Sequence, residues 1–309
     1  MRLGFSVRIF GRADLASHDG RRQQHLRAHW SVNLIYLRDI LGYLRANDIH
    51  MYRLHSELAP YDREQAAVDW AQLDECRAEL EAVGALARAG DIRLSFHPYS
   101  AVVLNAVNEE QVARSVACLQ AEAALLDGLG LGPEAVVVLH VGGVYDNAEA
   151  SRERFVRRYA ALPEGVRRRV VLENDDHRFS HADTRAIHEQ CGVALVLDQL
   201  HHLVHNPEGI PMREALEYAL GTWPAGVTPK IHFSSPRTEM RQEGARIKLP
   251  TWTEHSDFVN PFEFIAFMRE MAGLPPLDIM LESKARDLAL LKLREELHRF
   301  EPDWAQLIR

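Results

Sequence analysis

Short β-rich runs alternate with longer stretches of helical periodicity along this whole chain, and no linker interrupts them. Such alternation is typical of repeated βα units around a parallel sheet. Eight strands are predicted, at residues 3–9, 49–54, 92–96, 135–140, 169–173, 193–198, 229–234 and 278–282. Helices are predicted at residues 26–46, 64–88, 108–129, 149–161, 181–190, 211–221, 261–273 and 284–298.

Eight βα units with right-handed crossovers close most naturally into a TIM (β/α)8 barrel, whose usual length is roughly 250 residues. Many of the predicted strands are continuously apolar, as expected when both faces of a sheet are covered. The alternative is an open doubly wound sheet, but the first βα turn lacks a Gly-rich phosphate fingerprint. We therefore expect an α/β fold with a single TIM-barrel domain over residues 1–309.

Composition excludes several classes of partner. The chain has 36 Lys+Arg against 44 Asp+Glu, a formal net charge of −8, which excludes binding of nucleic acid through a histone-like basic tail. No apolar run approaches the roughly 20 residues that span a bilayer, and the amino terminus has no long apolar signal core. Three widely spaced cysteines do not form a disulfide set. We expect a cytoplasmic monomer without a membrane or protein partner.

The residues that end the predicted strands are nearly all of types that bind metal ions, and in a TIM barrel these ends converge on the active site. A single histidine or glutamate at such a place usually makes a structural hydrogen bond or caps a helix. The whole set indicates a metal site, because carboxylates and imidazoles buried together at one barrel mouth need compensating cations. The residues are Glu57, His97, His140, Glu173, Asp198, His201, His202, His232 and Glu282.

A mixed His, Asp and Glu set without thiolates favours Mn²⁺, Zn²⁺ or Fe²⁺ over Mg²⁺ or Ca²⁺. So many ligand positions predict two or three ions, which suits phosphoester hydrolysis. Lys230 and His232 are two residues apart on one strand and so point to the same side of the sheet. Because a cationic cluster repels an ammonium, Lys230 is either neutral, chemically modified, for example carboxylated by CO₂, or turned outward.

With these residues in view, the chain resembles the UV damage endonuclease family from its first strand to its eighth. The matching blocks are RLGF (2–5), NLIYLRDILGYLRAN (33–47), YRLHSELAP (52–60), HP (97–98), LHVGGVYDNAEASRERF (139–155), LENDD (172–176), LDQLHH (197–202), PKIHFS (229–234), HSDF (255–258) and MLESKAR (280–286). The resemblance implies a barrel with a three-metal, usually manganese, centre. It also implies hydrolysis of the DNA phosphodiester 5′ to a damaged or abasic nucleotide by a metal-activated hydroxide.

Carried over position by position, the resemblance implies a specific set of metal ligands. Position 57 varies in type within the family, and the family has a modified lysine where Lys230 stands. We predict Lys230, Glu173 and His232 as catalytic residues. The implied ligands are Glu57, His97, His140, Glu173, Asp198, His201, His232, His255 and Glu282.

The chain departs from the family on the side that would face the lesion and the phosphate. After the His-Pro pair the family usually has Gly, Gln and then Tyr or Phe, which wedge into the duplex, whereas Tyr99, Ser100 and Ala101 stand here. Ile9 replaces an Asn that the family places near the scissile phosphate, and Phe5 replaces a Tyr. Tyr99 is an alternative source of an aromatic contact. The predicted substrate-binding residues are Arg8, Tyr99, Ser100 and Asn174.

Two further segments are candidates for the active face. The longest irregular stretch, roughly residues 234–259, is expected to lie over it, because loops of that length are usually functional. The first βα segment is rich in arginine, which either binds phosphates or covers a solvated surface. Its arginines are Arg2, Arg8, Arg12, Arg21, Arg22 and Arg27.

Three functions remain open at this point. The leading hypothesis is a metal-dependent hydrolase that nicks damaged double-stranded DNA. A second keeps the metals but assigns a small phosphorylated or carbohydrate substrate, because sugar isomerases and epimerases have similar barrel mouths. A third is a non-catalytic DNA-binding protein, against which the full ligand set argues, since a structural site needs only one closed ion.

Overall fold

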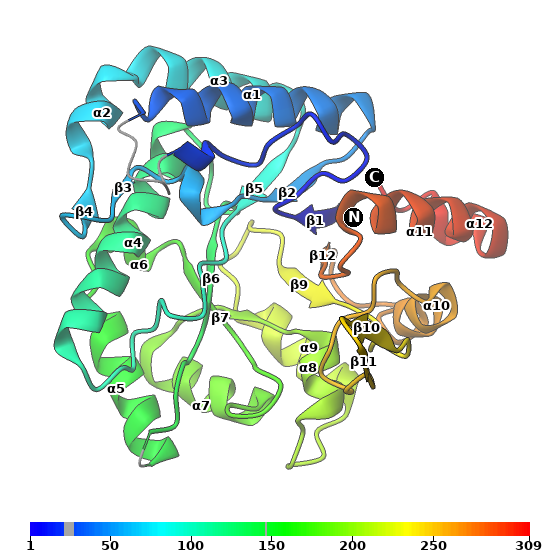
Figure 1. Cartoon of the computed structure of the whole chain (residues 1–309). Coiled ribbons are helices and arrows are strands. Elements are labelled where there is room, and N and C mark those ends of the chain that lie inside the picture. The colour runs from blue at the N-terminus through cyan, green and yellow to red at the C-terminus, as the bar shows by residue number, and fades with distance from the viewer. Residues whose placement is uncertain (22–27, 146) are drawn as a thin grey trace.

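Eight parallel strands enclose the centre of the molecule, and helices surround them (Figure 1). The computed structural model describes residues 1–21, 28–145 and 147–309. The predicted TIM barrel is confirmed over this part of the chain. Its strands are β1 (Leu3–Ser6), β2 (Met51–Arg53), β5 (Arg93–Ser95), β6 (Val137–His140), β7 (Val170–Glu173), β8 (Leu195–Val196), β9 (Lys230–Phe233) and β12 (Asp278–Leu281).

Two sheets join to close the barrel. One has the order β5-β2-β1-β12-β9, the other has the order β6-β7-β8, and every pairing in them is parallel. Parallel bridges between Phe96 and Val137, and between Asp198 and His232, connect the two sheets. All eight carboxyl ends therefore meet at one rim, where TIM-barrel active sites lie.

The helices pack outside the barrel and begin where the sequence offers caps. The Asn108 side chain accepts a hydrogen bond from the Gln111 amide at the start of α4, and Ser180 with Asp183 forms a capping box at α7. The longer helices are α1 (Ser31–Ala46), α3 (Arg77–Ala89), α4 (Glu109–Gly128), α5 (Ala148–Ala160), α7 (His181–Cys191), α9 (Met212–Gly221), α10 (Pro261–Glu270) and α11 (Arg286–Phe300). The shorter ones are η2 (Ser56–Leu58), α2 (Trp70–Glu75), α6 (Glu164–Arg167), α8 (Gln199–Val204) and α12 (Pro302–Ala305).

Two short hairpins differ from the predicted elements. The helix expected over 64–88 is replaced at its start by β3 (Tyr61–Asp62) and β4 (Ala67–Val68), and α2 and α3 follow. The loop expected over 234–259 contains β10 (Arg241–Glu243) and β11 (Arg246–Lys248). Strands of two or three residues are too short for an alternating pattern to distinguish them from loops.

A buried ion cluster closes the amino-terminal end of the barrel. Arg93 Nη1 lies 2.9 Å from Asp278 Oδ2, and Arg2 Nη1 lies 3.0 Å from the same oxygen. All three residues are buried. This end stabilises the fold and lies opposite the predicted site. Among the described residues, no helix is long and apolar enough to cross a membrane.

Candidate metal centre

The carboxyl ends of the strands bring most of the predicted ligands into one cluster. His97, Glu173, His232 and Glu282 each place one potential ligand atom within 4.8 Å of the others. Asp198 and His201 form a second such group together with the same Glu173. The two groups share a carboxylate, so they form one continuous site.

Glu173, the last residue of β7, lies at the centre of this cluster. Its Oε1 lies 2.9 Å from His232 Nδ1 and 3.6 Å from His201 Nδ1. Its Oε2 lies 2.9 Å from His97 Nε2 and 3.5 Å from His140 Nε2. The side chain has no solvent-exposed area, so these four imidazoles form its surroundings.

Glu282, directly after β12, forms the other side of the cluster. Its Oε1 lies 3.3 Å from His232 Nδ1, and its Oε2 lies 3.6 Å from His255 Nε2. It also forms an ion pair with Arg53 at the end of β2. Arg53 was not among the residues predicted from the sequence, although an arginine inside the apolar run 49–54 is an available signal.

A hydrogen-bonded shell orients Asp198 and His201. The Asn174 side chain accepts from the Asp198 amide at 2.9 Å and donates to the Asp198 carbonyl at 3.2 Å. The Nδ1 of His201 donates to the Asn174 carbonyl at 3.0 Å. This bond assigns the proton to Nδ1 and leaves Nε2 of His201 as an acceptor or ligand.

Several buried polar atoms in the cluster make no hydrogen bond to any residue that the structure describes, although leaving one unsatisfied costs about 1–3 kcal/mol. All are nitrogen or oxygen donors of the kind that Mn²⁺, Zn²⁺ and Fe²⁺ accept. The donor set therefore fits divalent transition-metal ions. The atoms are His140 Nδ1, Asp198 Oδ2, His232 Nε2 and His255 Nδ1.

Burial and the charges of neighbouring groups shift the pKa values of the cluster. Burial raises the pKa of Asp198 to about 7. Burial lowers the pKa of His201, but Asp198 and Glu173 outweigh it and raise that pKa to about 9. Burial lowers the pKa of His255 to about 4 and also lowers the pKa of His232, which keeps these imidazoles neutral. Neutral imidazoles are the form that binds metals.

Lys230 lies inside the barrel, as the alternation with His232 predicts. It is fully buried, and its Nζ donates to Ser95 Oγ at 3.2 Å. Burial lowers its pKa well below the ordinary value, and the neighbouring Arg93 and Arg53 act in the same direction. The outward orientation considered from the sequence is therefore wrong, and a neutral or modified amine remains.

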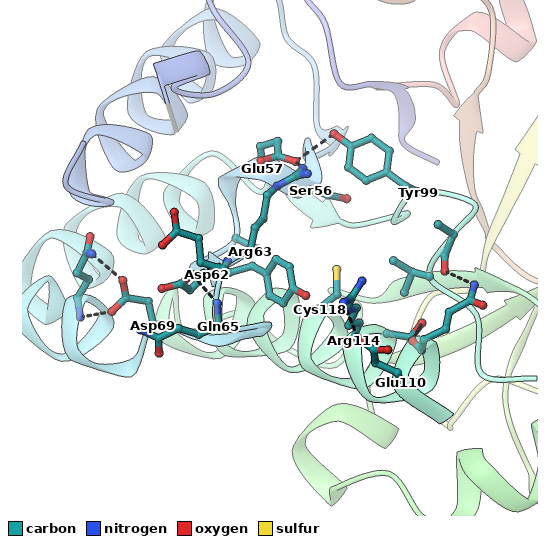
Figure 2. A pocket seen from close by; sticks show the side chains of 18 of the residues that line it. Ser56, Glu57, Asp62, Arg63, Gln65, Asp69, Tyr99, Glu110, Arg114 and Cys118 are labelled. Atoms are coloured by element: carbon teal, nitrogen blue, oxygen red, sulfur yellow. Dashed lines mark hydrogen bonds and ion pairs between the residues drawn. The ribbon is translucent and has the colours of Figure 1, made fainter. Parts of the chain in front are cut away.

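Glu57 lines a pocket and belongs to neither ligand group (Figure 2). The pocket has a volume of about 960 Å³ and lies between the 56–69 segment and α4. Glu57 forms an ion pair with Arg63, and the Tyr99 hydroxyl lies 3.4 Å from its Oε1. Its assignment as a metal ligand stays a prediction.

The predicted substrate-binding residues lie in two different environments. Arg8, Tyr99 and Ser100 are exposed on the loops that follow β1 and β5. Asn174 is buried, and its side chain binds the Asp198 backbone as described above. Their contacts with substrate stay predictions. Arg22 and Arg27 lie outside the described residues.

His202 shows why a histidine at a strand end is not always a ligand. It lies on α8 next to His201, but its Nε2 donates to the Ile210 carbonyl at 2.9 Å. It is buried and belongs to neither ligand group. Its role is therefore structural.

Comparisons with known proteins identify the family of this chain. The family model described as UV-endonuclease UvdE matches residues 7–303. A UV DNA damage endonuclease of Halalkalibacterium halodurans is 32% identical over 274 residues, which are 87% of this chain and 81% of that protein. The crystal structure of SacUVDE superposes with a TM-score of 0.79 at 29% identity and covers 97% of this chain and 98% of its own.

More distant structures share only the fold. Endonuclease IV from Thermus thermophilus is 16% identical, with a TM-score of 0.54 over 97% of this chain and 100% of its own. L-ribulose 3-epimerase is 17% identical, with a TM-score of 0.55 over 84% of this chain and 81% of its own. The family match spans nearly the whole chain and includes the cluster around Glu173 and Glu282. The chain belongs to the UV-endonuclease UvdE family.

Proposed function

We propose that this chain is a metal-dependent endonuclease that hydrolyses the DNA phosphodiester 5′ to a damaged or abasic nucleotide. The observation that carries the proposal is one buried cluster of three carboxylates, Glu173, Asp198 and Glu282, surrounded by histidines at the barrel mouth. Curated relatives at about 30% identity are named UV DNA damage endonucleases. No observation favours a sugar substrate, because the epimerase likeness concerns the fold alone.

Two or three divalent ions, with Mn²⁺ first and Zn²⁺ or Fe²⁺ as alternatives, would be held by this cluster. The proposed ligands are His97, His140, Glu173, Asp198, His201, His232, His255 and Glu282. When bound, such ions polarise the phosphate and activate water as a nucleophile. We assign Glu57 as an outer ligand, whose access depends on release from Arg63.

The protein groups themselves hold and orient the reacting parts. The Glu173 carboxylate accepts from His232 Nδ1, so that His232 Nε2, which makes no hydrogen bond to a described residue, would be available to hold a metal ion. Asn174 keeps Asp198 and His201 in place through backbone hydrogen bonds. This arrangement keeps the ligands in position before substrate arrives, which lowers the reorganisation that the reaction requires.

Positive charge beside Glu282 is suited to the phosphate of the substrate. Arg53 pairs with Glu282, while its Nε makes no hydrogen bond to a residue in the described ranges. Arg286 donates to Ser6 Oγ. Its backbone φ is 56°, a left-handed conformation that residues other than glycine keep only when the surrounding structure constrains them. We assign Arg53 and Arg286 to the scissile phosphate, with Arg8 and Tyr99 on the adjoining exposed loops.

Three further features complete the proposal. Lys230 would be carboxylated, which would convert its buried neutral amine into an anion. The substrate would be damaged double-stranded DNA, and Ser100 would line its path. The protein would act in the cytoplasm as a monomer.

A nicking assay tests the function. The wild-type protein loaded with Mn²⁺ is incubated with a duplex that carries one photoproduct or one abasic site and, separately, with an undamaged duplex. We expect a nick immediately 5′ to the lesion, only in the damaged duplex, and none from Glu173→Gln. Absence of a nick from the wild type, or equal cutting by the variant, would refute the proposal.

A further inference from the structure

The β9–α10 connection carries a projecting arm, defined here as residues 236–255. Its base is held by an antiparallel bridge between Pro236 and His255 and by the Ser256 amide, which donates to the Ser235 carbonyl at 2.9 Å. Its tip is the β10–β11 hairpin, with a two-residue turn in which Gly244 has a φ of 62°. In Figure 1 the hairpin stands beside α10.

The two faces of the hairpin differ in chemistry. Arg241 pairs with Lys248, and Gln242 pairs with Ile247. The two members of a pair lie on the same face of the hairpin, and these two neighbouring pairs lie on opposite faces. Continued alternation places Met240 on the face of Gln242 and Leu249 on the face of Ile247. The hairpin therefore has one largely apolar face and one charged face.

The apolar face is turned toward solvent, which is the reverse of the ordinary arrangement. Arg241 Nη2 and Lys248 Nζ each lie 2.8 Å from Glu254 Oε1, so the charged face is directed to the returning limb of the arm. The exposed fractions of the apolar side chains are large: Met240 65%, Ile247 70%, Leu249 67% and Trp252 76%. A contiguous exposed apolar patch of this kind marks an interaction site.

The arm starts at the metal centre. His255, at its base, lies 3.6 Å from Glu282 in the cluster. No arm residue is more than about ten residues from this base, so none can lie farther than roughly 33 Å from it. One turn of duplex DNA is about 34 Å long. The whole arm therefore lies within about the length of one helical turn from the scissile phosphate of a duplex bound for cleavage.

Charge favours DNA as this partner. The 236–255 arm carries four Arg and Lys against three Glu, a slight positive excess in a chain whose net charge is −8. Arg246, at the tip, is exposed and makes no ion pair within the part of the chain that the structure describes. Cations beside exposed apolar side chains are the combination with which proteins contact phosphates and enter the minor groove, where apolar residues lie against sugars or between base steps.

We propose that the 236–255 arm is a DNA-contacting element whose apolar face, Met240, Ile247 and Leu249, enters the minor groove beside the scissile phosphate while Arg246 contacts the backbone. The inference rests on the proposed function and adds a contact with the substrate. It assigns a duplex-probing role to a loop other than the one that carries Tyr99 and Ser100.

Equilibrium binding tests the arm without depending on cleavage. The Mn²⁺-loaded protein is titrated against a fluorescent duplex that carries an abasic analogue and a hydrolysis-resistant methylphosphonate 5′ to it. We expect the triple variant Met240→Ser/Ile247→Ser/Leu249→Ser to raise Kd about 10-fold or more, with an unchanged salt dependence. Arg246→Ala should lower the slope of log Kd against log salt by about 1, because it removes one phosphate contact.

Leu307→Ser is the matched control, because Leu307 is 58% exposed and its carbonyl accepts from the Met1 amine at the opposite end of the barrel. Its Kd should stay within about twofold of wild type. Manganese content and thermal midpoint should be equal in all variants. If the triple variant fails to fold, Ile247→Ser alone should raise Kd about threefold.

Two results overturn the inference. One is a Kd of the triple variant within about twofold of wild type, and the other is a wild-type protein that does not bind the duplex. A wild-type dimer that the triple variant converts to a monomer, with unchanged DNA affinity, would assign the face to self-association. Nicking of a cleavable lesion duplex separates the two proposals. If the wild type binds this duplex but does not nick it, the proposed endonuclease function is refuted and the DNA contact of the arm is not. If wild type and triple variant bind and nick it equally, the DNA contact of the arm is refuted and the endonuclease function is not.

Discussion

Glu173 Oε1 and His232 Nδ1 lie 2.9 Å apart, and neither side chain has any solvent-exposed area. The two residues come from β7 and β9, on either side of β8 in the barrel wall. Their contact aligns a carboxylate with an imidazole whose Nε2 has no hydrogen-bond partner in the part of the chain that the structure describes. Glu173 also contacts His97, His140 and His201, so the cluster depends on its charge more than on that of any single histidine.

Glu173→Gln should remove this central charge while keeping the shape of the side chain. We expect less than one retained equivalent of Mn²⁺ and a fall in the nicking rate on the order of 10³-fold, because metal ions supply the charge stabilisation in such reactions. Metal content by mass spectrometry and single-turnover nicking measure both. Glu189→Gln, at an exposed glutamate of α7 that pairs with Arg185, is the control and should match wild type. A fully active, metal-loaded Glu173→Gln protein would contradict the role of Glu173.

Lys230 should carry a carboxyl group. Its buried Nζ contacts Ser95 Oγ, and the neighbouring Arg93 and Arg53 disfavour an ammonium. The amine nitrogen would bond to the carbon of CO₂ and release one proton. Protein loaded with Zn²⁺ and incubated with ¹³C-bicarbonate should show a carbamate signal in ¹³C NMR that Lys230→Met lacks. An identical spectrum for both proteins would show that Lys230 is unmodified.

Gly142 is required by the loop that follows His140. Its φ is 116°, and a Cβ there would overlap Oδ1 of the fully buried Asn105. Gly142→Ala should lower the free energy of unfolding by about 2 kcal/mol or more and should reduce nicking as well. Gly221→Ala, where an added Cβ meets no atom within 4 Å, is the control and should be neutral or slightly stabilising. Equal urea midpoints for the two variants would contradict the prediction.

Glu122 makes stability depend on pH. It is fully buried on α4, and burial raises its pKa from an ordinary value of 4.5 to about 8, with Ser56 opposing the shift. The folded chain thus holds a proton that the unfolded chain loses above pH 4.5. Stability from this group is fully present below about pH 4.5 and is lost as the pH rises through about 8, with a slope of at most about 1.4 kcal/mol per pH unit.

Glu122→Gln should flatten this dependence and should be more stable than wild type at pH 8. Urea unfolding between pH 5 and 8, at constant metal loading, measures the free energy of unfolding of both proteins as a function of pH. Glu110→Gln, on the exposed side of the same helix, should leave the wild-type dependence unchanged. Parallel curves for wild type and Glu122→Gln would mean that Glu122 stays ionised in the fold.

The barrel and most of the cluster could be predicted from sequence because both follow from strand periodicity. His140, Glu173 and His232 lie on strands, and the parallel order brings strand ends together. The positions of side chains on loops do not follow from strand periodicity. Glu57 follows β2 on η2, where its pairing with Arg63 depends on the β3–β4 hairpin that periodicity does not reveal.

Contacts between distant charges also lie beyond sequence patterns. Arg53 pairs with Glu282 across 229 residues of chain, and the amide of Asn174 binds the backbone of Asp198. Neither contact leaves a local pattern, because each depends on which strands are neighbours in the closed barrel. The exposed apolar face of the 236–255 arm was likewise visible only once the register of β10 and β11 was known.

Anomalous diffraction at the manganese edge, from crystals of the Mn²⁺-loaded protein, tests the account most directly. We predict two or three peaks inside the cluster, within bonding distance of Glu173, Asp198 and Glu282. A map without peaks there, or with manganese only at other sites of the molecule, would contradict the assignment of this cluster as the catalytic centre.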